Sequence, residues 1–167
     1  HGLKWEAGGK SSLVKADNNL SYYDISNGNP VFDSLQSNHF IYSENINALY
    51  STFSLERKGN SLQVGLRAEQ TIAQGDQLLN QRSFSRKYWQ LFPTLFFTHK
   101  FSDKHDMGFS FSRRIQRPGY DMMNPFKLFI DATTFKEGNP YLLPQNSYLF
   151  ELTHTYKQQV LTTFSAS

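Results

Sequence analysis

The sequence of 167 residues contains no cysteine and no long hydrophobic run, and it has no excess of acidic residues. Without cysteine it is not a disulfide scaffold. Because no stretch approaches 18 consecutive apolar residues, it has no candidate transmembrane helix. The 17 basic and 14 acidic side chains give a formal charge of +3. These basic residues form no cluster, so we expect no nucleic-acid partner. Collagen-like repeats and coiled-coil heptads are also absent.

β-Branched aliphatic residues are scarce as well, with only 4 valines and 6 isoleucines. Aromatic residues are abundant instead: the chain has 15 Phe, 9 Tyr and 2 Trp, which is 16% of its residues. Rings in such number suit the core of a soluble protein or the lipid-facing wall and interfacial rim of a membrane barrel. Composition alone leaves both open.

The dominant pattern along the chain is alternation of apolar and polar residues with a period of two, which indicates β-strands. In the clearest run Leu62, Val64 and Leu66 alternate with Gln63 and Arg67. Similar runs occupy 3–8, 84–101, 107–116 and 148–157. The runs are about 11 to 18 residues long, well above the usual strand length of about 5–6.

Turn residues separate these runs. Short turns are expected at 58–60, 102–104 and 157–159, and long connections at 18–38, 75–83 and 118–146. Gly59 and Asn60 tolerate the positive φ angles of a tight hairpin. The pattern predicts an all-β fold: an antiparallel meander of about seven long strands.

Two interpretations of this meander are possible. In the first it is part of a transmembrane β-barrel, in which apolar side chains face lipid and polar ones face a wet lumen. The charges expected on the lumenal face are Arg67, Glu69, Arg86 and Glu151. They suit cross-strand ion pairs, worth about 0.2–1 kcal/mol each, or contacts with a plug or a solute. In the second interpretation the chain is a soluble β-sandwich that binds glycans.

Loop aromatic residues would supply the glycan contacts in the second interpretation, because rings stack on sugars. The candidates are Tyr22, Tyr23, Phe32, Tyr120, Phe126 and Phe129. The alternative is that these rings form the loops' own small core or belong to an aromatic belt at the membrane surface.

The stretch 113–144 has the most distinctive composition. Pro118 and Gly119 end a strand, because proline cannot donate to a β-ladder. The loop that follows is rich in aromatic residues, so we expect it to be packed and ordered over 118–146. Its characteristic residues are Arg113, Arg114, Arg117, Pro118, Asn124, Pro125, Phe126, Asp131, Gly138, Asn139, Pro140 and Pro144.

This ordered set, with the upstream segments 42–46, 65–69 and 88–93, resembles the TonB-dependent-receptor-like outer-membrane β-barrel proteins of Bacteroidetes. The resemblance implies a barrel of about 22 strands in the bacterial outer membrane. It also implies a plug domain and active solute uptake driven by a TonB-type energising complex, with outer-membrane lipid around the wall. The solute and the residues that bind it stay unknown.

Bacterial barrels of one chain have even strand numbers, and an odd number is expected here. We therefore expect residues 1–167 to form a single β-barrel segment that is incomplete by itself. Such a segment has two sheet edges that need covering.

The three arginines before the long loop are expected on different faces. Alternation places Arg114 on the lumenal face, and Arg113 and Arg117 on the face of Phe109 and Phe111. There Arg113 and Arg117 would either meet lipid headgroups or anchor the loop. The anchoring alternative is favoured, with three loop carboxylates as candidate partners: Asp121, Asp131 and Glu137.

The sequence shows no catalytic or metal-binding motif. There is no Gly-x-Ser-x-Gly and no phosphate-binding glycine loop, and the five histidines lack metal spacing. Ser110 or Ser112 beside His99 or His105 is the one conceivable Ser–His pair. We expect no enzymatic activity and no cofactor.

Overall fold

In a computed structural model of the chain, the described residues are 2–26, 28–79, 81–131, 133–157 and 160–166. The strands are β1 (Gly2–Leu20), β2 (Tyr23–Asp24), β3 (Val31–Phe32), β4 (Asn38–Arg57), β5 (Asn60–Gln77), β6 (Arg82–Ser102), β7 (His105–Gln116), β8 (Lys127–Phe129), β9 (Phe135–Glu137), β10 (Gln145–Tyr156) and β11 (Val160–Ala166). One short helix, α1, covers Tyr120–Met123. The predicted all-β fold is confirmed.

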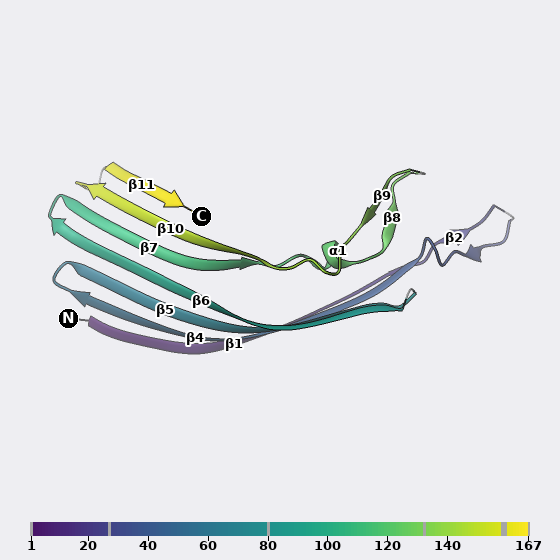
Figure 1. Cartoon of the computed structure of the whole chain (residues 1–167), viewed down its shortest axis with the longest axis horizontal. Coiled ribbons are helices and arrows are strands. Elements are labelled where there is room, and N and C mark those ends of the chain that lie inside the picture. The colour runs from purple at the N-terminus through teal and green to yellow at the C-terminus, as the bar shows by residue number, and fades with distance from the viewer. Residues whose placement is uncertain (1, 27, 80, 132, 158–159, 167) are drawn as a thin grey trace.

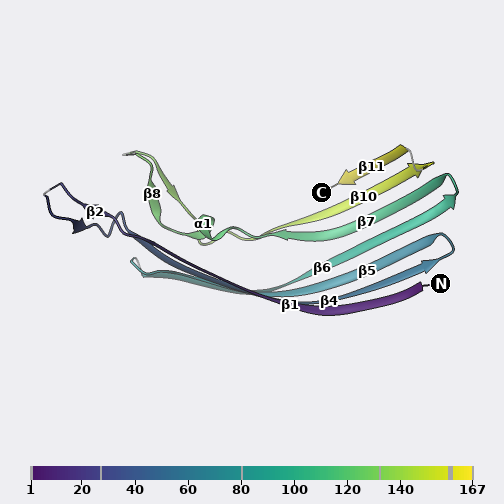
Figure 2. The ribbon, with the colours of Figure 1, turned by 180° about the vertical axis from the view of Figure 1, so that it is seen from behind.

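Seven of the strands form one antiparallel sheet in the order β1-β4-β5-β6-β7-β10-β11. Figures 1 and 2 show this curved sheet, with the two small sheets β2–β3 and β8–β9 in the connections at one end. The meander of seven long strands is thus confirmed, although β11 has only 7 residues. The two small sheets were not predicted, because strands of two or three residues leave no periodic signal.

The tight turns β4–β5 and β6–β7 lie at one end of the sheet, where the N-terminus also lies (Figure 1). Lys58 and Gly59 join β4 to β5 with φ angles of 42° and 79°. Positive φ at both central residues is the geometry of a type I′ hairpin turn. Asp103 and Lys104 join β6 to β7, since Ser102 pairs with His105. In the third predicted turn, residues 158 and 159 lie outside the described residues.

The connections at the other end differ in length. The predicted long loop 75–83 is wrong, because β5 and β6 continue until Gln77 pairs with Arg82, which leaves only 78–81 between them. The connections 21–37 and 117–144 are long and carry β2–β3, α1 and β8–β9. In outer-membrane barrels short turns face the periplasm and long loops face the outside.

The outer face of the sheet is apolar over the half that lies nearer the tight turns; we call this the lower half. Here a row means the residues that the strand register places side by side across the sheet. One row is made of Leu3, Leu55, Leu62, Phe97, Phe109, Leu152 and Phe164. The next is Trp5, Phe53, Val64, Leu95, Phe111, Phe150 and Ala166. Trp5 is 71% exposed and Phe164 is 69% exposed, so the rest of this chain leaves most of the surface of both rings uncovered.

Polar rows bound this apolar zone. One contains Asn60, His99, Met107, His154 and Thr162, and the other contains Ser11, Asn47, Gln70 and Trp89. We call the outer face between these two rows the belt. On β6 it extends from Trp89 to His99, which matches the roughly 9–11 residues that a tilted strand needs to cross a bilayer.

The inner face behind the belt is polar. A row on this face contains Lys4, Ser54, Gln63, Phe96, Ser110, Glu151 and Ser165. A sheet with one apolar and one hydrated face is the arrangement of a barrel wall, with lipid outside and water inside.

Beyond the Gln70 row the polarity of the two faces reverses. We call this upper part of β1, β4, β5 and β6, together with residues 117–144, the extension. Its outer face carries Lys15, Ser43, Gln74 and Ser85, and its inner face carries Ala16, Tyr42, Gly75 and Phe84. The buried hydrophobic cluster of the described residues lies on that inner face, where Met123 of α1 packs with Phe40, Tyr42 and Ala73.

Candidate functional site on the inner face

The inner face holds two large cavities, one behind the belt and one in the extension. The cavity behind the belt has a volume of about 850 Å³ and is lined mostly by inner-face residues of β1, β4, β5, β6, β7 and β10. The cavity in the extension has a volume of about 860 Å³ and lies between the strands and residues 125–141. Both volumes are in the range of small-molecule sites.

Glu69 forms ion pairs with two arginines in the cavity behind the belt. Its Oε1 lies 2.8 Å from Nε of Arg67, and its Oε2 lies 2.6 Å from Nη2 of Arg117. The same Nη2 donates to the hydroxyl of Thr71, at 3.1 Å. The Glu69 side chain is only 10% exposed, and a carboxylate that leaves water needs such partners.

The position of Arg117 corrects the prediction. Its partner is Glu69 on β5 and not Asp121, Asp131 or Glu137, and its side chain lies on the inner face rather than toward lipid. Strand β7 ends at Gln116, so the alternation that assigned Arg117 to the outer face does not extend to it. The side chain crosses from the start of the long loop to β5 and thereby ties the loop to the wall.

Arg113 lies where β6 and β7 separate. The β6–β7 ladder ends at the pair Thr94–Ser112, next to Pro93, which has no N–H to donate. Beyond this point Nη1 of Arg113 donates to the carbonyl of Leu91, at 2.9 Å. Its guanidinium also lies over two rings, 5.7 Å from the centroid of Phe92 and 5.8 Å from that of Tyr148. Among the described residues, Arg113 thus forms no ion pair with a loop carboxylate.

The other predicted lumenal charges divide into bonded and unbonded groups. Arg86 donates from both terminal nitrogens to the carbonyls of Pro140 and Leu142, and so holds the end of the long loop. Arg114 and Glu151 line the cavity behind the belt. Among the described residues neither makes an ion pair or a side-chain hydrogen bond.

The Asn-Pro-Phe and Gly-Asn-Pro segments of the loop are joined to each other. The amide of Gly138 donates to the carbonyl of Asn124, and that of Asn139 donates to the carbonyl of Met122. A Cβ on Gly138 would lie 2.5 Å from the Asn124 carbonyl oxygen, so only glycine permits this approach. The Asn124 side chain accepts from the amide of Phe126, which fixes the turn at Pro125.

The remaining motif residues shape the loop and its ends. Pro118 follows the end of β7, and Pro144 directly precedes β10. Asp131 accepts hydrogen bonds from the amide and hydroxyl of Thr133 and from the amide of Thr134. These bonds favour the carboxylate and lower the pKa of Asp131 below its ordinary value of 3.8.

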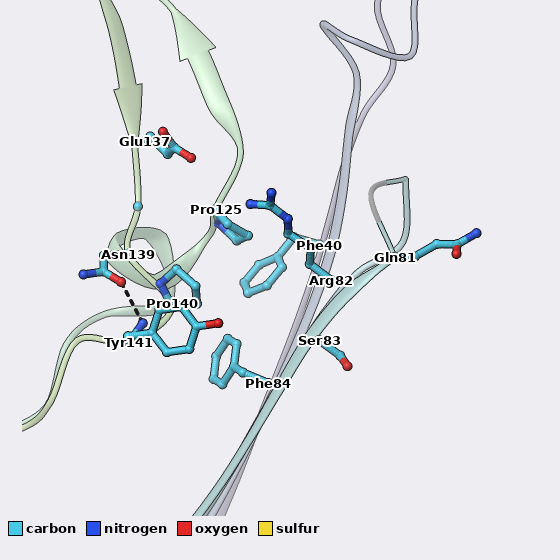
Figure 3. A pocket seen from close by; sticks show the side chains of 11 residues that line it. Phe40, Gln81, Arg82, Ser83, Phe84, Pro125, Glu137, Asn139, Pro140 and Tyr141 are labelled. Atoms are coloured by element: carbon cyan, nitrogen blue, oxygen red, sulfur yellow. Dashed lines mark hydrogen bonds between the residues drawn. The ribbon is translucent and has the colours of Figure 1, made fainter.

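The cavity in the extension is bounded by apolar rings and prolines. Figure 3 shows Phe40 and Phe84 from the strands facing Pro140 and Tyr141 from the loop, with the Asn139 side chain bonded to the amide of Tyr141. Gly75 gives room for this packing, because a Cβ there would lie 2.3 Å from the Phe84 ring. Sequence reasoning missed this cavity, since Pro140 in one wall lies 56 positions from Phe84 and 100 positions from Phe40 in the other.

The aromatic loop residues proposed as a sugar platform fall into separate places. Tyr23 and Phe32 pack edge to face on β2–β3, with ring centroids 5.7 Å apart. Tyr120 and Phe126 line a third cavity, of about 200 Å³, against Asn18 and Leu20. The side chain of Phe129 lies outside the described residues.

The conceivable Ser–His pair is wrong. Ser110 and Ser112 lie on the inner face, whereas His99 shares an outer-face row with Met107. His105 stacks on His154, 5.3 Å between ring centroids, at the end with the short turns. Within the described part of the chain, no group of three or more His, Cys, Asp or Glu side chains is arranged to hold a metal.

These faces define the class of protein: a long-stranded antiparallel wall with an apolar outer face and a largely polar inner face. The whole chain, residues 1–167, matches the model of the outer membrane protein beta-barrel family, and the chain belongs to this family. It is a protein of the bacterial outer membrane. Comparison with curated proteins and with solved structures gives no match. Among the described residues no helix is both long and apolar enough to cross a membrane.

The soluble β-sandwich does not hold. The long strands form one sheet, and in the described ranges no second large sheet packs on it. The belt leaves Leu3, Trp5 and Leu49 about 70% exposed, which an isolated soluble domain would leave in contact with water.

Proposed function

We propose that this chain is part of the barrel wall of a TonB-dependent-receptor-like protein of Bacteroidetes that takes up a solute. The ordered motifs of residues 113–144 support the family assignment by resemblance. The partners would be outer-membrane lipid around the belt, a plug domain in the lumen and a TonB-type energising complex. The proposal assigns the chain no catalytic chemistry and no cofactor.

The proposal rests on the opposite polarity of the two faces of the sheet. The belt is apolar on the outer face, and the inner face behind it carries polar and charged groups. Backbone groups are satisfied by strand pairing, which a bilayer requires because hydrocarbon offers no partners. The inner face keeps Arg67, Glu69 and Glu151 in a cavity of about 850 Å³. A solute in the lumen would meet these charged groups and several hydroxyl groups beside apolar side chains such as Phe92 and Phe96.

The position of the long loop supports a role in capture. Residues 117–144 pack on the inner face at the end with the long connections, which is the extracellular end in such barrels. They are tied there by Arg117, which pairs with Glu69 on β5, and by Arg86 on β6, which donates to loop carbonyls. A solute entering from outside would therefore pass this segment before it reached the cavity behind the belt.

The test compares what three strains remove from growth medium: the wild type, a strain without this protein and a strain without its TonB-type complex. We expect the same solutes to remain in the medium of both mutants, measured by mass spectrometry. Re-expression of the wild-type protein should restore their depletion. If the strain without the protein removes every solute as fast as the wild type, uptake by this protein is refuted.

A further inference from the structure

The cavity behind the belt has an unequal charge balance. Five cationic side chains line it: Lys10, Arg67, Arg113, Arg114 and Arg117. Only two carboxylates line it, Glu69 and Glu151. The formal charge of these seven residues is therefore +3, five positive charges less two negative ones.

The ion pairs of the cavity do not remove this excess. Glu69 is already shared by Arg67 and Arg117, at 2.8 and 2.6 Å. Among the described residues, no carboxylate forms an ion pair with Lys10, Arg113 or Arg114. Guanidinium donors also exceed acceptors, since the buried Nε atoms of Arg113 and Arg117 have no hydrogen-bond partner within the described residues.

The arrangement of these groups suits several oxyanions at once. The cations come from β1, β5, β7 and the start of the long loop, so they converge from different sides of one cavity. The guanidinium fork binds carboxylate and phosphate oxygens through two parallel hydrogen bonds. Phe92, which is 2% exposed, supports two of the forks, with Arg67 5.0 Å and Arg113 5.7 Å from its centroid.

We propose that the cavity behind the belt binds a small polyanion with several carboxylate or phosphate groups, with Arg114 and Lys10 as its unpaired contacts. A cavity of about 850 Å³ holds a molecule with several carboxylate or phosphate groups. The proposal names the solute class for the uptake function and in that sense rests on it. Binding itself is a property of the cavity and is measured independently.

The experiment uses the native full-length protein, purified from outer membranes in detergent micelles. Citrate and pyrophosphate are titrated calorimetrically, with the neutral disaccharide trehalose as the comparison. We expect the two anions to bind and trehalose not to bind, with affinity that falls as salt is raised. The two anions separate carboxylate from phosphate preference. If neither anion binds more tightly than trehalose, the proposal is wrong.

Three variants locate the site. Arg114→Gln and Lys10→Gln should each weaken anion binding by roughly tenfold, the usual effect of losing a hydrogen bond to a charged group. Arg114→Lys keeps the charge but loses the fork and should weaken binding less. The control is Lys87→Gln, which removes an exposed cation from the outer face of β6 and should change affinity less than twofold.

The outcomes separate this proposal from the uptake function. Equal affinity in the wild type and in Arg114→Gln, with the folded form of each shown by an unheated gel band, overturns the site. If the strain comparison shows that the protein and the complex are needed to take up a neutral solute, the uptake function is retained and only the assignment of a polyanion as the solute is wrong. Anion binding without any uptake phenotype would retain the site and overturn only the transport.

Discussion

The belt and the extension are built from the same strands, yet they bury opposite faces. In the belt the side chains of Leu62 and Phe97 face outward and polar groups face inward. In the extension Phe40 and Phe84 face inward under the long loop, and Lys15 and Ser43 face outward. Side chains therefore continue to alternate between the two faces along the whole strand, while the environment of each face changes from one region to the next. The apolar face of the first region is the exposed outer one, which suits lipid, and the apolar face of the second is covered by the protein's own loop.

The largest expected effect comes from removing the core of the extension. Phe40 is 1% exposed, and Phe40→Ala should cost about 3–5 kcal/mol in the local stability of the packed loop. Trypsin should then cleave more rapidly at Lys127 and Lys136, while the gel shift of the folded barrel persists. The control, Leu143→Ala, removes a side chain that is 77% exposed and should leave cleavage unchanged. A simultaneous loss of the gel shift would show that the two regions are not independent.

The next effect tests the belt. Leu95→Arg places a charge on the outer face near the middle of the belt, where arginine costs about 2–4 kcal/mol. Ser85→Arg places the same charge on the outer face of the extension and should cost about 0–1 kcal/mol. The free energy of unfolding from lipid vesicles in urea measures both. Equal costs at the two positions would remove the boundary that we place near Trp89.

Breaking the link between the regions should have a smaller effect. Glu69→Gln leaves Arg67 and Arg117 without their shared carboxylate and should destabilise the start of the long loop by about 1–3 kcal/mol. Faster proteolysis of residues 117–144 is the expected result. Glu151→Gln is the control, because Glu151 makes no ion pair among the described residues. If the two variants are cleaved alike, Arg117 does not anchor the loop.

The smallest effect is a local response to pH. The hydrogen bonds that lower the pKa of Asp131 stabilise its turn fully above the ordinary value of 3.8. This stabilisation is lost as pH falls through the lowered pKa. Amide exchange at Thr133 and Thr134 should therefore accelerate only in strong acid, measured relative to intrinsic exchange rates. Asp131→Asn should remove the pH dependence, and the belt amides should show none.

Alternation and turn residues were enough to predict the seven strands, the type of sheet and the two faces of the belt. The period of two assigns each side chain to a face, and Gly59 marks a turn because of its positive φ. Alternation also predicted inner-face positions for Arg67, Glu69, Arg114 and Glu151, all of which line one cavity.

The errors have a common physical origin in long-range contacts. Arg117 pairs with Glu69, which lies 48 positions away, and no local pattern encodes that contact. The alternation rule also stops applying where β7 ends at Gln116. The reversal of polarity in the extension depends on the loop that covers it, and the loop's packing onto Phe40 and Tyr42 is again non-local.

The end of the β6–β7 ladder at Pro93 has a mechanical consequence. A tube resists bending because each strand transmits load to both neighbours around its circumference. Above Pro93 the pairing of β6 with β7 stops. Strands β1, β4, β5 and β6 continue as a four-stranded sheet, here called the leaf, whose β6 edge pairs with no other strand of the described sheet. Side-chain contacts cross this gap instead: Arg113 to the Leu91 carbonyl, Arg117 to Glu69, Gln90 to Asn146, and Arg86 to the carbonyls of Pro140 and Leu142. We therefore expect the leaf to be more compliant than the belt below it.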